Sequence, residues 1–273
     1  MNKNHSTTKP LDSLEQQLKK MQTLDLPAEA QSLLDEALEC LDEAKQEQAE
    51  FVSTVTHELR IPMTSIMGYT DLLRQGAMGE VNDNQLNFLN VIRDNVARMS
   101  RLISDLSDIH KIESGRMHLE PEPLSVSNAV QSGLELAKKT LNGHGSAVEI
   151  AIAEDLPLVK ADSRRVAQMV QYLLENAVLY SPAGQPVMVK AQQEENFVRL
   201  MIVDRGIGIK LEDQPHIFTQ FFRSEVEEVR DHKGWGLSLS LVKSLAEFSG
   251  GQAGYETEPG AGSTFWFTLP LPE

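Results

Sequence analysis

The sequence predicts a helical hairpin that dimerises into a four-helix bundle, followed by an α/β sandwich domain. Apolar residues between positions 52 and 110 repeat at steps of three and four, which is typical of helices packed in a bundle. After Gly115, strand-like apolar runs alternate with helix-like segments, which indicates one mixed sheet covered by a layer of helices. The chain therefore combines α with α/β architecture.

Composition limits the partners of the chain. Among its 273 residues, 40 are acidic and 25 are basic, and the formal net charge of -15 repels the phosphate backbone of nucleic acid. No apolar run is long enough to predict a membrane span, and the polar start has no signal-peptide core, so we expect a cytoplasmic protein. Cys40 is the only cysteine, which argues against an intrachain disulfide or a cysteine-rich zinc site.

The N-terminal half is predicted to be helical throughout. Residues 1–45 form a polar tail and a coiled-coil-like region, in which Pro27 separates two helical stretches. Residues 46–114 form the hairpin, with a glycine-containing turn between Gly76 and Asp83. Its two apolar stripes are Val52, Val55, Leu59, Pro62, Ile66, Tyr69, Leu73 and Leu89, Ile92, Val96, Met99, Ile103, Leu106, His110. A lone hairpin leaves one stripe uncovered, and a homodimer would cover it.

The C-terminal half begins with a proline-containing linker at residues 115–126, which passes through a short strand. Residues 127–273 form the sandwich domain. We expect helices at 127–141, 164–180 and 237–248, and strands near 146–154, 186–192, 197–204, 251–256 and 264–270.

His57 is the candidate reactive residue of the hairpin. If Val52 occupies heptad position a, His57 falls at position f and points away from the bundle core. Such a residue can be an ordinary solvated histidine. However, Glu58 can accept a hydrogen bond from one ring nitrogen and so make the other a better nucleophile. Pro62 removes a backbone hydrogen bond to the carbonyl of Glu58, which predicts a kink beside the histidine.

The segment FVSTVTHELRIPMTSI, residues 51–66, resembles the phospho-acceptor motif of the sensor histidine kinases of two-component systems. In that family the hairpin dimerises and autophosphorylates on the histidine. The resemblance implies that His57 is the nucleophile and Glu58 its proton acceptor. It also implies that the phosphoryl group passes to an aspartate on the receiver domain of a response regulator.

Motifs of the family's nucleotide domain follow in the family's order. LLENAVLYSP, residues 173–182, resembles the asparagine box of the GHKL (Bergerat) ATP-binding fold, in which Asn176 would hold Mg²⁺ and Tyr180 would lie at the nucleotide. VDRGIGI, residues 203–209, resembles the first glycine box. Asp204 would bind the adenine amino group, and Gly206 and Gly208 would let the backbone approach the base. By itself, this D-x-G-x-G pattern could be a plain turn.

Three further segments complete the resemblance. IFTQFFR, residues 217–223, resembles the phenylalanine box at the start of the ATP lid, although an amphipathic helix is an alternative; Arg223 could reach the phosphates. KGWGLSLSLVKSLAEFSGG resembles the second glycine box, in which Gly234, Gly236 and Leu237 open a helix whose amides face the phosphates. GAGSTFWFTLP matches the last strand and places Thr264 near adenine. The implied cofactors are ATP and Mg²⁺.

The sequence departs from the family pattern at four positions. Asparagine, lysine and glycine are usual where this chain has Tyr172, Leu179 and Ser238. Threonine or asparagine often stands at Ile61, where it helps to position the water that dephosphorylates the partner, so we expect weak phosphatase activity. Tyr172 argues against the ATP-hydrolysing relatives, which have a glutamate there. Two hypotheses stay open: an active histidine kinase, or a catalytically impaired dimeric module that binds nucleotide or a partner.

Overall fold

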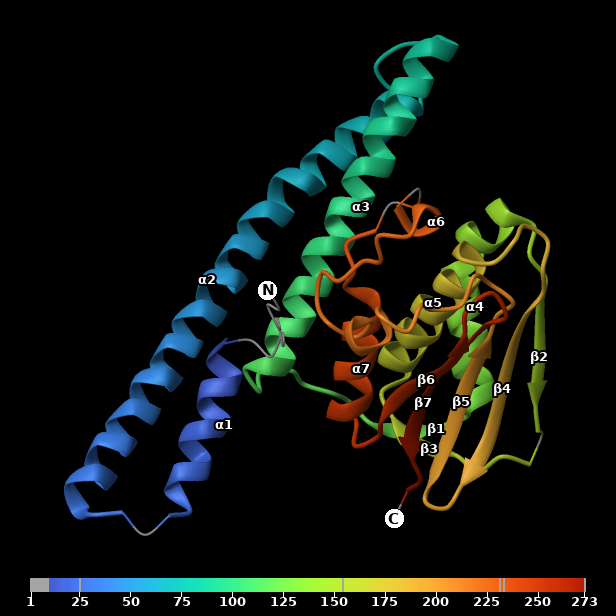
Figure 1. Cartoon of the computed structure of the whole chain (residues 1–273). Coiled ribbons are helices and arrows are strands. Elements are labelled where there is room, and N and C mark those ends of the chain that lie inside the picture. Colours follow the sequence, from blue (N-terminus) through green and yellow to red (C-terminus); the bar gives the residue numbers. More distant parts are fainter. Residues whose placement is uncertain (1–9, 25, 154, 231, 233, 273) are drawn as a thin grey trace. The chain divides into compact units, whose positions relative to one another are not determined.

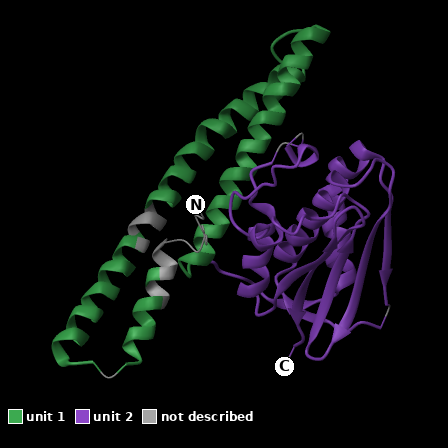
Figure 2. Cartoon of the chain, in the orientation of Figure 1, with its two compact units in different colours: residues 1–116 green, residues 117–273 purple. Residues whose placement is uncertain are grey.

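The computed structural model describes residues 10–24, 26–153, 155–230, 232 and 234–272. It divides into two compact units, residues 1–116 and residues 117–273, which Figure 2 shows in different colours. The first unit is built of helices, and the second combines helices with a sheet (Figure 1). The predicted order, a helical region followed by an α/β domain, is therefore confirmed.

The first unit contains three helices, α1 (Pro10–Gln22), α2 (Ala28–Arg74) and α3 (Asp83–Glu113). Pro27 immediately precedes α2, where its fixed φ suits the entry to a helix and ends the preceding segment. α1 packs against the N-terminal half of α2, in which Leu34 and Leu41 are buried. α2 continues without a break through Pro62, so one 47-residue helix joins the N-terminal region to the hairpin.

The turn between α2 and α3 has the residues that a reversal of the chain requires. Gly76 and Gly79 adopt positive φ angles of 73° and 118°, which glycine accepts without steric cost. Asn82 then caps α3 through a reciprocal capping box with Gln85. Nearby, the Asp71 carboxylate on α2 accepts a 2.9 Å hydrogen bond from Arg93 on α3. These contacts set the register of the hairpin.

The two hairpin helices meet along one face of each. Met63 on α2 and Val96 and Ile103 on α3 form a buried cluster with Met67 packed against it. On α2, Thr56 and Thr70 are buried seven residues to either side of Met63. The neighbouring apolar face of α2 lies in solvent in the single chain, where it exposes Val55, Leu59, Ile66, Tyr69 and Leu73. On α3, Ile92 and Met99 are likewise exposed.

The second unit is built on a five-stranded sheet of order β2-β4-β5-β7-β6. β2 pairs with β4 in parallel, and every other neighbouring pair is antiparallel. The bounds are β2 (Val148–Ile152), β4 (Val187–Glu194), β5 (Phe197–Val203), β6 (Ala253–Glu258) and β7 (Gly262–Pro270). A separate antiparallel pair joins β1 (Glu122–Leu124) to β3 (Val159–Ala161). β1 corresponds to the short strand expected in the linker.

Helices α4 (Val126–His144), α5 (Ser163–Leu179) and α7 (Ser238–Phe248) cover one face of this sheet (Figure 1). The strands alternate accordingly: on β5, Val198, Leu200 and Ile202 are buried, whereas the residues between them are partly exposed. The core is apolar and includes Val130, Met169, Leu173, Leu174, Leu241, Leu245, Phe267 and Leu269. The unit also contains the short helices η1 (Gln214–His216) and α6 (Glu227–Arg230).

Candidate functional site

His57 lies on an exposed face of α2. Its side chain is 70% exposed, and that of Glu58 is 71% exposed. The preceding residue, Thr56, is buried, which fixes the phase of the helix so that the imidazole points outward. His57 Nδ1 lies 3.5 Å from Glu58 Oε1, so the carboxylate can accept the Nδ1 proton and leave Nε2 as the free nucleophilic nitrogen. Ile61, one turn later, is also exposed.

Asp204 is a buried carboxylate of the second unit. It follows β5, and its Oδ1 accepts hydrogen bonds from the backbone amides of Gly206 (2.8 Å) and Ser263 (3.1 Å). Burial raises the pKa of the Asp204 carboxyl above its usual value, and these two hydrogen bonds oppose part of the shift. Its Oδ2 has no hydrogen-bond partner among the described residues, so one acceptor is available for a ligand.

The glycines after Asp204 allow close contacts between backbone segments. A Cβ on Gly206 would lie 2.4 Å from the carbonyl oxygen of Tyr180, which also accepts a hydrogen bond from the Ile207 amide. Gly208 has a positive φ of 64°, and a Cβ there would lie 2.1 Å from the carbonyl oxygen of Glu258. Neither position accepts a side chain. The first glycine box is therefore fixed between the end of α5 and the end of β6.

Thr264 lies beside this segment on β7. In the sheet it pairs with Val203, the residue that precedes Asp204. The adjacent Ser263 supplies one of the two amides that hold Asp204, and Gly262, with φ of 107°, would bring a Cβ within 2.2 Å of the Asp204 carbonyl oxygen. Sequence reasoning did not identify Ser263 or Gly262. The only sequence signal was the glycine-rich start of the GAGST segment.

Asn176 and Tyr180 occupy the last turn and the C-cap of α5. The Asn176 side-chain amide forms no hydrogen bond with the part of the chain that the structure describes, so its oxygen is free to bind a cation. Burial raises the pKa of the Tyr180 phenol, and the positive charge of Arg223 acts in the opposite direction. One turn before Asn176, Tyr172 is buried within the unit.

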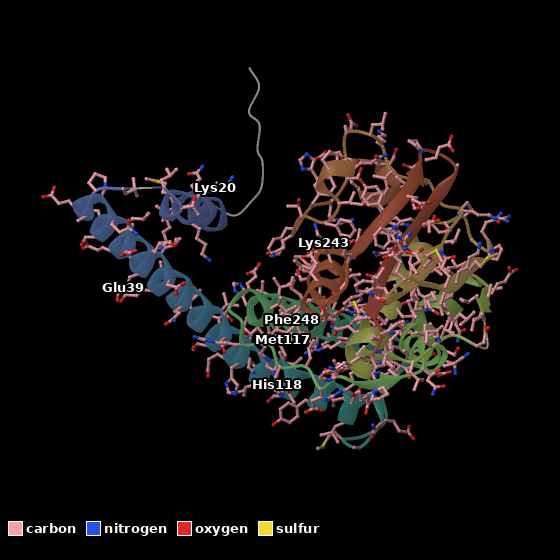
Figure 3. All side chains as sticks on the ribbon, turned by 90° about the horizontal axis from the view of Figure 1, so that it is seen from below. Lys20, Glu39, Met117, His118, Lys243 and Phe248 are labelled. Atoms are coloured by element: carbon pink, nitrogen blue, oxygen red, sulfur yellow. The ribbon has the colours of Figure 1, made fainter. Side chains whose placement is uncertain are left out.

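The segment of residues 217–236, which leads into α7, is called the lid here. Residues 217–223 form no helix, so the alternative of an amphipathic helix is wrong for this segment. Phe218 lies beside the Tyr255 ring at 5.9 Å and beneath Lys243 of α7 at 5.5 Å; Lys243 is labelled in Figure 3. Arg223 donates hydrogen bonds to carbonyl oxygens within the lid itself.

The second glycine box leads into α7, which begins at Ser238. Gly236 has φ of 70°, and a Cβ there would lie 2.4 Å from the carbonyl oxygen of Phe222. Gly234 has no neighbour within 4 Å of such a Cβ and does not have a positive φ. Leu237 is buried at the N-cap of α7, where its carbonyl oxygen accepts the Leu241 amide. The two glycines are therefore under different constraints.

These contacts bring most of the predicted nucleotide residues together within the second unit. The Tyr180 carbonyl links the asparagine box to the first glycine box, Ser263 links Asp204 to the last strand, and Arg223 links the phenylalanine box to Gly234 of the second glycine box. Over the described residues, no group of three or more His, Cys, Asp or Glu side chains could hold a metal ion.

Two family models match the chain. The His Kinase A (phospho-acceptor) domain matches residues 47–115, and the histidine kinase-, DNA gyrase B-, and HSP90-like ATPase matches residues 161–273. Together they cover about two-thirds of the chain. The first match contains His57, and the second contains Asn176, Asp204, the lid and Thr264.

Curated relatives extend the match over most of the chain. Sensor protein DivL of Caulobacter vibrioides is 36% identical over 240 residues, which are 88% of this chain and 30% of that protein. The circadian input-output histidine kinase CikA of Synechococcus elongatus is 32% identical over 246 residues, 88% of this chain and 32% of that protein. The chain thus spans about a third of the length of these relatives.

Solved structures share the fold. The full-length ShkA structure in complex with AMPPNP has a TM-score of 0.68 at 24% identity and covers 82% of this chain and 46% of ShkA. The histidine kinase AdeS of Acinetobacter baumannii has a TM-score of 0.56 at 23% identity and covers 80% of this chain and 98% of AdeS. No described helix of the present chain has the length and apolar character needed to cross a membrane.

Proposed function

Because the chain belongs to the sensor histidine kinases, we propose that it is an ATP-dependent protein-histidine kinase that phosphorylates itself on His57. The observation that carries this proposal is the environment of Asp204. A buried carboxylate with one oxygen held by two backbone amides and the other unpaired is a preorganised acceptor for the amino group of adenine. The Asp204 site would thus bind the nucleotide, and His57 would act as an accessible nucleophile.

The chemistry proposed for His57 is a direct phosphoryl transfer. Nε2 attacks the γ-phosphorus of ATP, an N–P bond forms, and the P–O bond to the leaving ADP breaks. The Nδ1 proton passes to Glu58, whose carboxylate lies 3.5 Å from that nitrogen. Asn176 would hold Mg²⁺, which neutralises charge on the phosphates when it is bound. Tyr180, Gly206, Gly208, Gly234, Gly236, Leu237 and Thr264 complete the proposed nucleotide site.

The partners proposed are a second copy of the chain and a response-regulator receiver domain. The exposed face of α2 with Val55, Leu59 and Ile66 would be covered by the second copy, which completes a four-helix bundle. His57 lies outside this face and stays accessible to an aspartate of the receiver domain. A cytoplasmic location is part of the same proposal.

Labelling with ATP tests the kinase. Wild-type protein incubated with γ-labelled ATP and Mg²⁺ should acquire acid-labile label, and His57→Gln should acquire none while it still binds nucleotide. Glu58→Gln serves as a second variant and should slow labelling without removing the acceptor. Label that survives on His57→Gln, or that is stable to acid on the wild type, would exclude His57 as the phosphorylated residue.

The second candidate is a kinase-derived module that binds nucleotide but transfers no phosphate. It is favoured by the departures at Tyr172, Leu179 and Ser238, of which Tyr172 is buried and has no amide oxygen to offer a cation. The same labelling experiment separates the two candidates. Nucleotide binding by wild-type protein without any label on His57 would establish the module.

A further inference from the structure

The Arg223 side chain fastens the lid internally through backbone carbonyl groups of the lid itself. Arg223 Nη1 donates to the Gly234 carbonyl oxygen at 3.0 Å, and Nη2 donates to the carbonyl oxygens of Val229 and His232 at 2.5 Å. These three acceptors are spread over the last half of the lid. A planar guanidinium can serve several acceptors at fixed angles, which a lysine ammonium cannot reproduce.

The two ends of the lid are fixed without Arg223. At one end, the Ser224 hydroxyl donates to Asp213 Oδ2 at 2.5 Å and accepts from the Val226 amide at 3.2 Å. At the other end, the Phe221 amide donates to the Gly236 carbonyl oxygen at 3.0 Å. The Arg223 side chain therefore restrains the middle of the lid, and its removal should loosen residues 225–230, 232, 234 and 235 while the ends stay in place.

The restrained segment contacts the proposed nucleotide site through His232. The His232 ring meets the Tyr180 ring edge-on, with 5.8 Å between centroids and an angle of 82°. Tyr180 is the C-cap of α5, the helix that carries Asn176. On its other side, His232 lies 6.4 Å from the His144 ring at the end of α4. The hydrogen bond from Arg223 to the His232 carbonyl oxygen thus holds the His232 ring against Tyr180, at the end of α5.

We infer that Arg223 is a positioning residue that latches the lid against Tyr180, in place of the phosphate contact expected from the sequence. This inference rests on the proposed function, because it assumes that nucleotide binds beside Tyr180. A latch acts on the lid as a whole, so its loss should weaken every adenine nucleotide by the same factor. A phosphate contact should instead affect ATP more than ADP, and a lysine should partly replace it.

Calorimetric titration of the full chain with ATP and with ADP tests the latch. Arg223→Gln and Arg223→Lys should each weaken both nucleotides by about tenfold, as expected for loss of charge-assisted hydrogen bonds. Arg230→Gln is the matched control: Arg230 lies exposed in the same lid, and its side chain forms no hydrogen bond with the described residues. It should leave both affinities within about twofold of wild type, because its charge is screened by solvent. Wild-type affinity in Arg223→Lys, or a selective loss of ATP binding, would overturn the inference.

Hydrogen exchange on the nucleotide-free chain tests the latch independently of binding. Amides of residues 225–230, 232, 234 and 235 should exchange faster in both Arg223 variants than in wild type or Arg230→Gln, with protection in β5 and β7 unchanged. Unchanged exchange in the lid would refute the latch even if nucleotide affinity fell. If wild-type protein bound no nucleotide, the proposed function would fail, and the exchange comparison would still decide whether Arg223 restrains the lid.

Discussion

The two units of the chain differ in how completely they bury their apolar side chains. The second unit encloses Val130, Met169, Leu200 and Phe267 with essentially no exposure, so its core is complete within one chain. The first unit buries a narrow seam around Met63 and leaves a second apolar face of α2 in solvent. A contiguous exposed apolar face typically marks an interaction surface. The core of the second unit is therefore complete within one chain, whereas the first unit leaves an apolar face that the proposed second copy would cover.

The largest expected effect is on assembly of the first unit. Ile66→Glu places a charge in the exposed apolar face and should convert the dimer to a monomer, because an unpaired carboxylate is costly to bury. Light scattering measures the change. Ser65→Glu is the control, since Ser65 is exposed outside the predicted stripe, and it should remain a dimer. A monomeric wild type would remove the basis for the contrast between the units.

The second expected effect separates binding from stability in the nucleotide unit. Asp204→Asn replaces the unpaired acceptor and should weaken ATP binding by about ten- to a hundredfold, since a hydrogen bond to a charged group contributes about 1.5–3 kcal/mol. The asparagine oxygen can still accept from Gly206 and Ser263, so the unfolding midpoint should not fall. Trp235 and Trp266 both lie in the second unit, so tryptophan fluorescence reports its unfolding. Unchanged ATP affinity would exclude Asp204 as the adenine residue.

The raised pKa of the Asp204 carboxyl predicts that both stability and nucleotide affinity depend on pH. Because burial raises the pKa of Asp204, its protonation in the folded state begins at a higher pH than the usual value of about 3.9. The charged form opposes folding at neutral pH, and this cost is relieved as the pH falls through the raised pKa. Nucleotide affinity should change in the opposite sense and decrease with falling pH. The ratio of wild-type to Asp204→Asn affinity cancels titration of the nucleotide, and a ratio that does not change as the pH is lowered would contradict the assignment.

A smaller effect is expected at the two glycines before α7. Gly236→Ala introduces a Cβ at a positive φ and against the Phe222 carbonyl, and should lower the free energy of unfolding by about 1–2 kcal/mol. Gly234→Ala meets no neighbour and should change it by less than about 0.5 kcal/mol. Urea unfolding of both variants measures the difference. Equal effects would show that the contact between Gly236 and Phe222 does not restrict the lid.

The smallest effect is expected on dephosphorylation. Ile61 is exposed one turn after His57, where it cannot orient a water molecule, so Ile61→Thr should increase a weak phosphatase activity. Phosphate release from a phosphorylated receiver domain is the measurement, and Ile61→Val, which keeps the branched shape without the hydroxyl, is the control. Strong phosphatase activity in the wild type would contradict this role of Ile61.

The sequence was sufficient to predict the elements with strong periodicity. The alternation in FVRLMIV predicted β5, and the apolar repeats predicted the hairpin helices. The three-residue strand β3 was not predicted, because three residues are too few to establish a period. On α3 the predicted stripe included the seam residues Val96 and Ile103, but the α2 side of the intrachain seam was missed. On α2 this seam is formed by Met63 with Thr56 and Thr70 on either side of it. Because threonine is polar, a search for apolar repeats passes over these positions and selects the neighbouring apolar face, which is exposed in the single chain.

The site was predictable where the motif is local and not where it depends on distant contacts. Asp204, Gly206 and Gly208 lie within five residues and form a recognisable pattern. The amide of Ser263 reaches Asp204 across 59 positions in the sequence, and only the pairing of β5 with β7 brings them together. The contacts of Arg223 were missed for a related reason, since carbonyl acceptors belong to every residue and leave no signature in the sequence.

Because α2 is one uninterrupted helix, the directions in which its side chains point are fixed relative to one another along its whole length. Its 47 residues correspond to about 70 Å of rigid helix, with Leu34 and Leu41 near one end and His57 beyond the middle. One residue added between Leu41 and His57 would turn the α1-bearing end by about 100° about the helix axis, whereas seven added residues would return it to within about 20°. The orientation of α1 around this axis and the direction in which His57 points are thus set by a single count of residues.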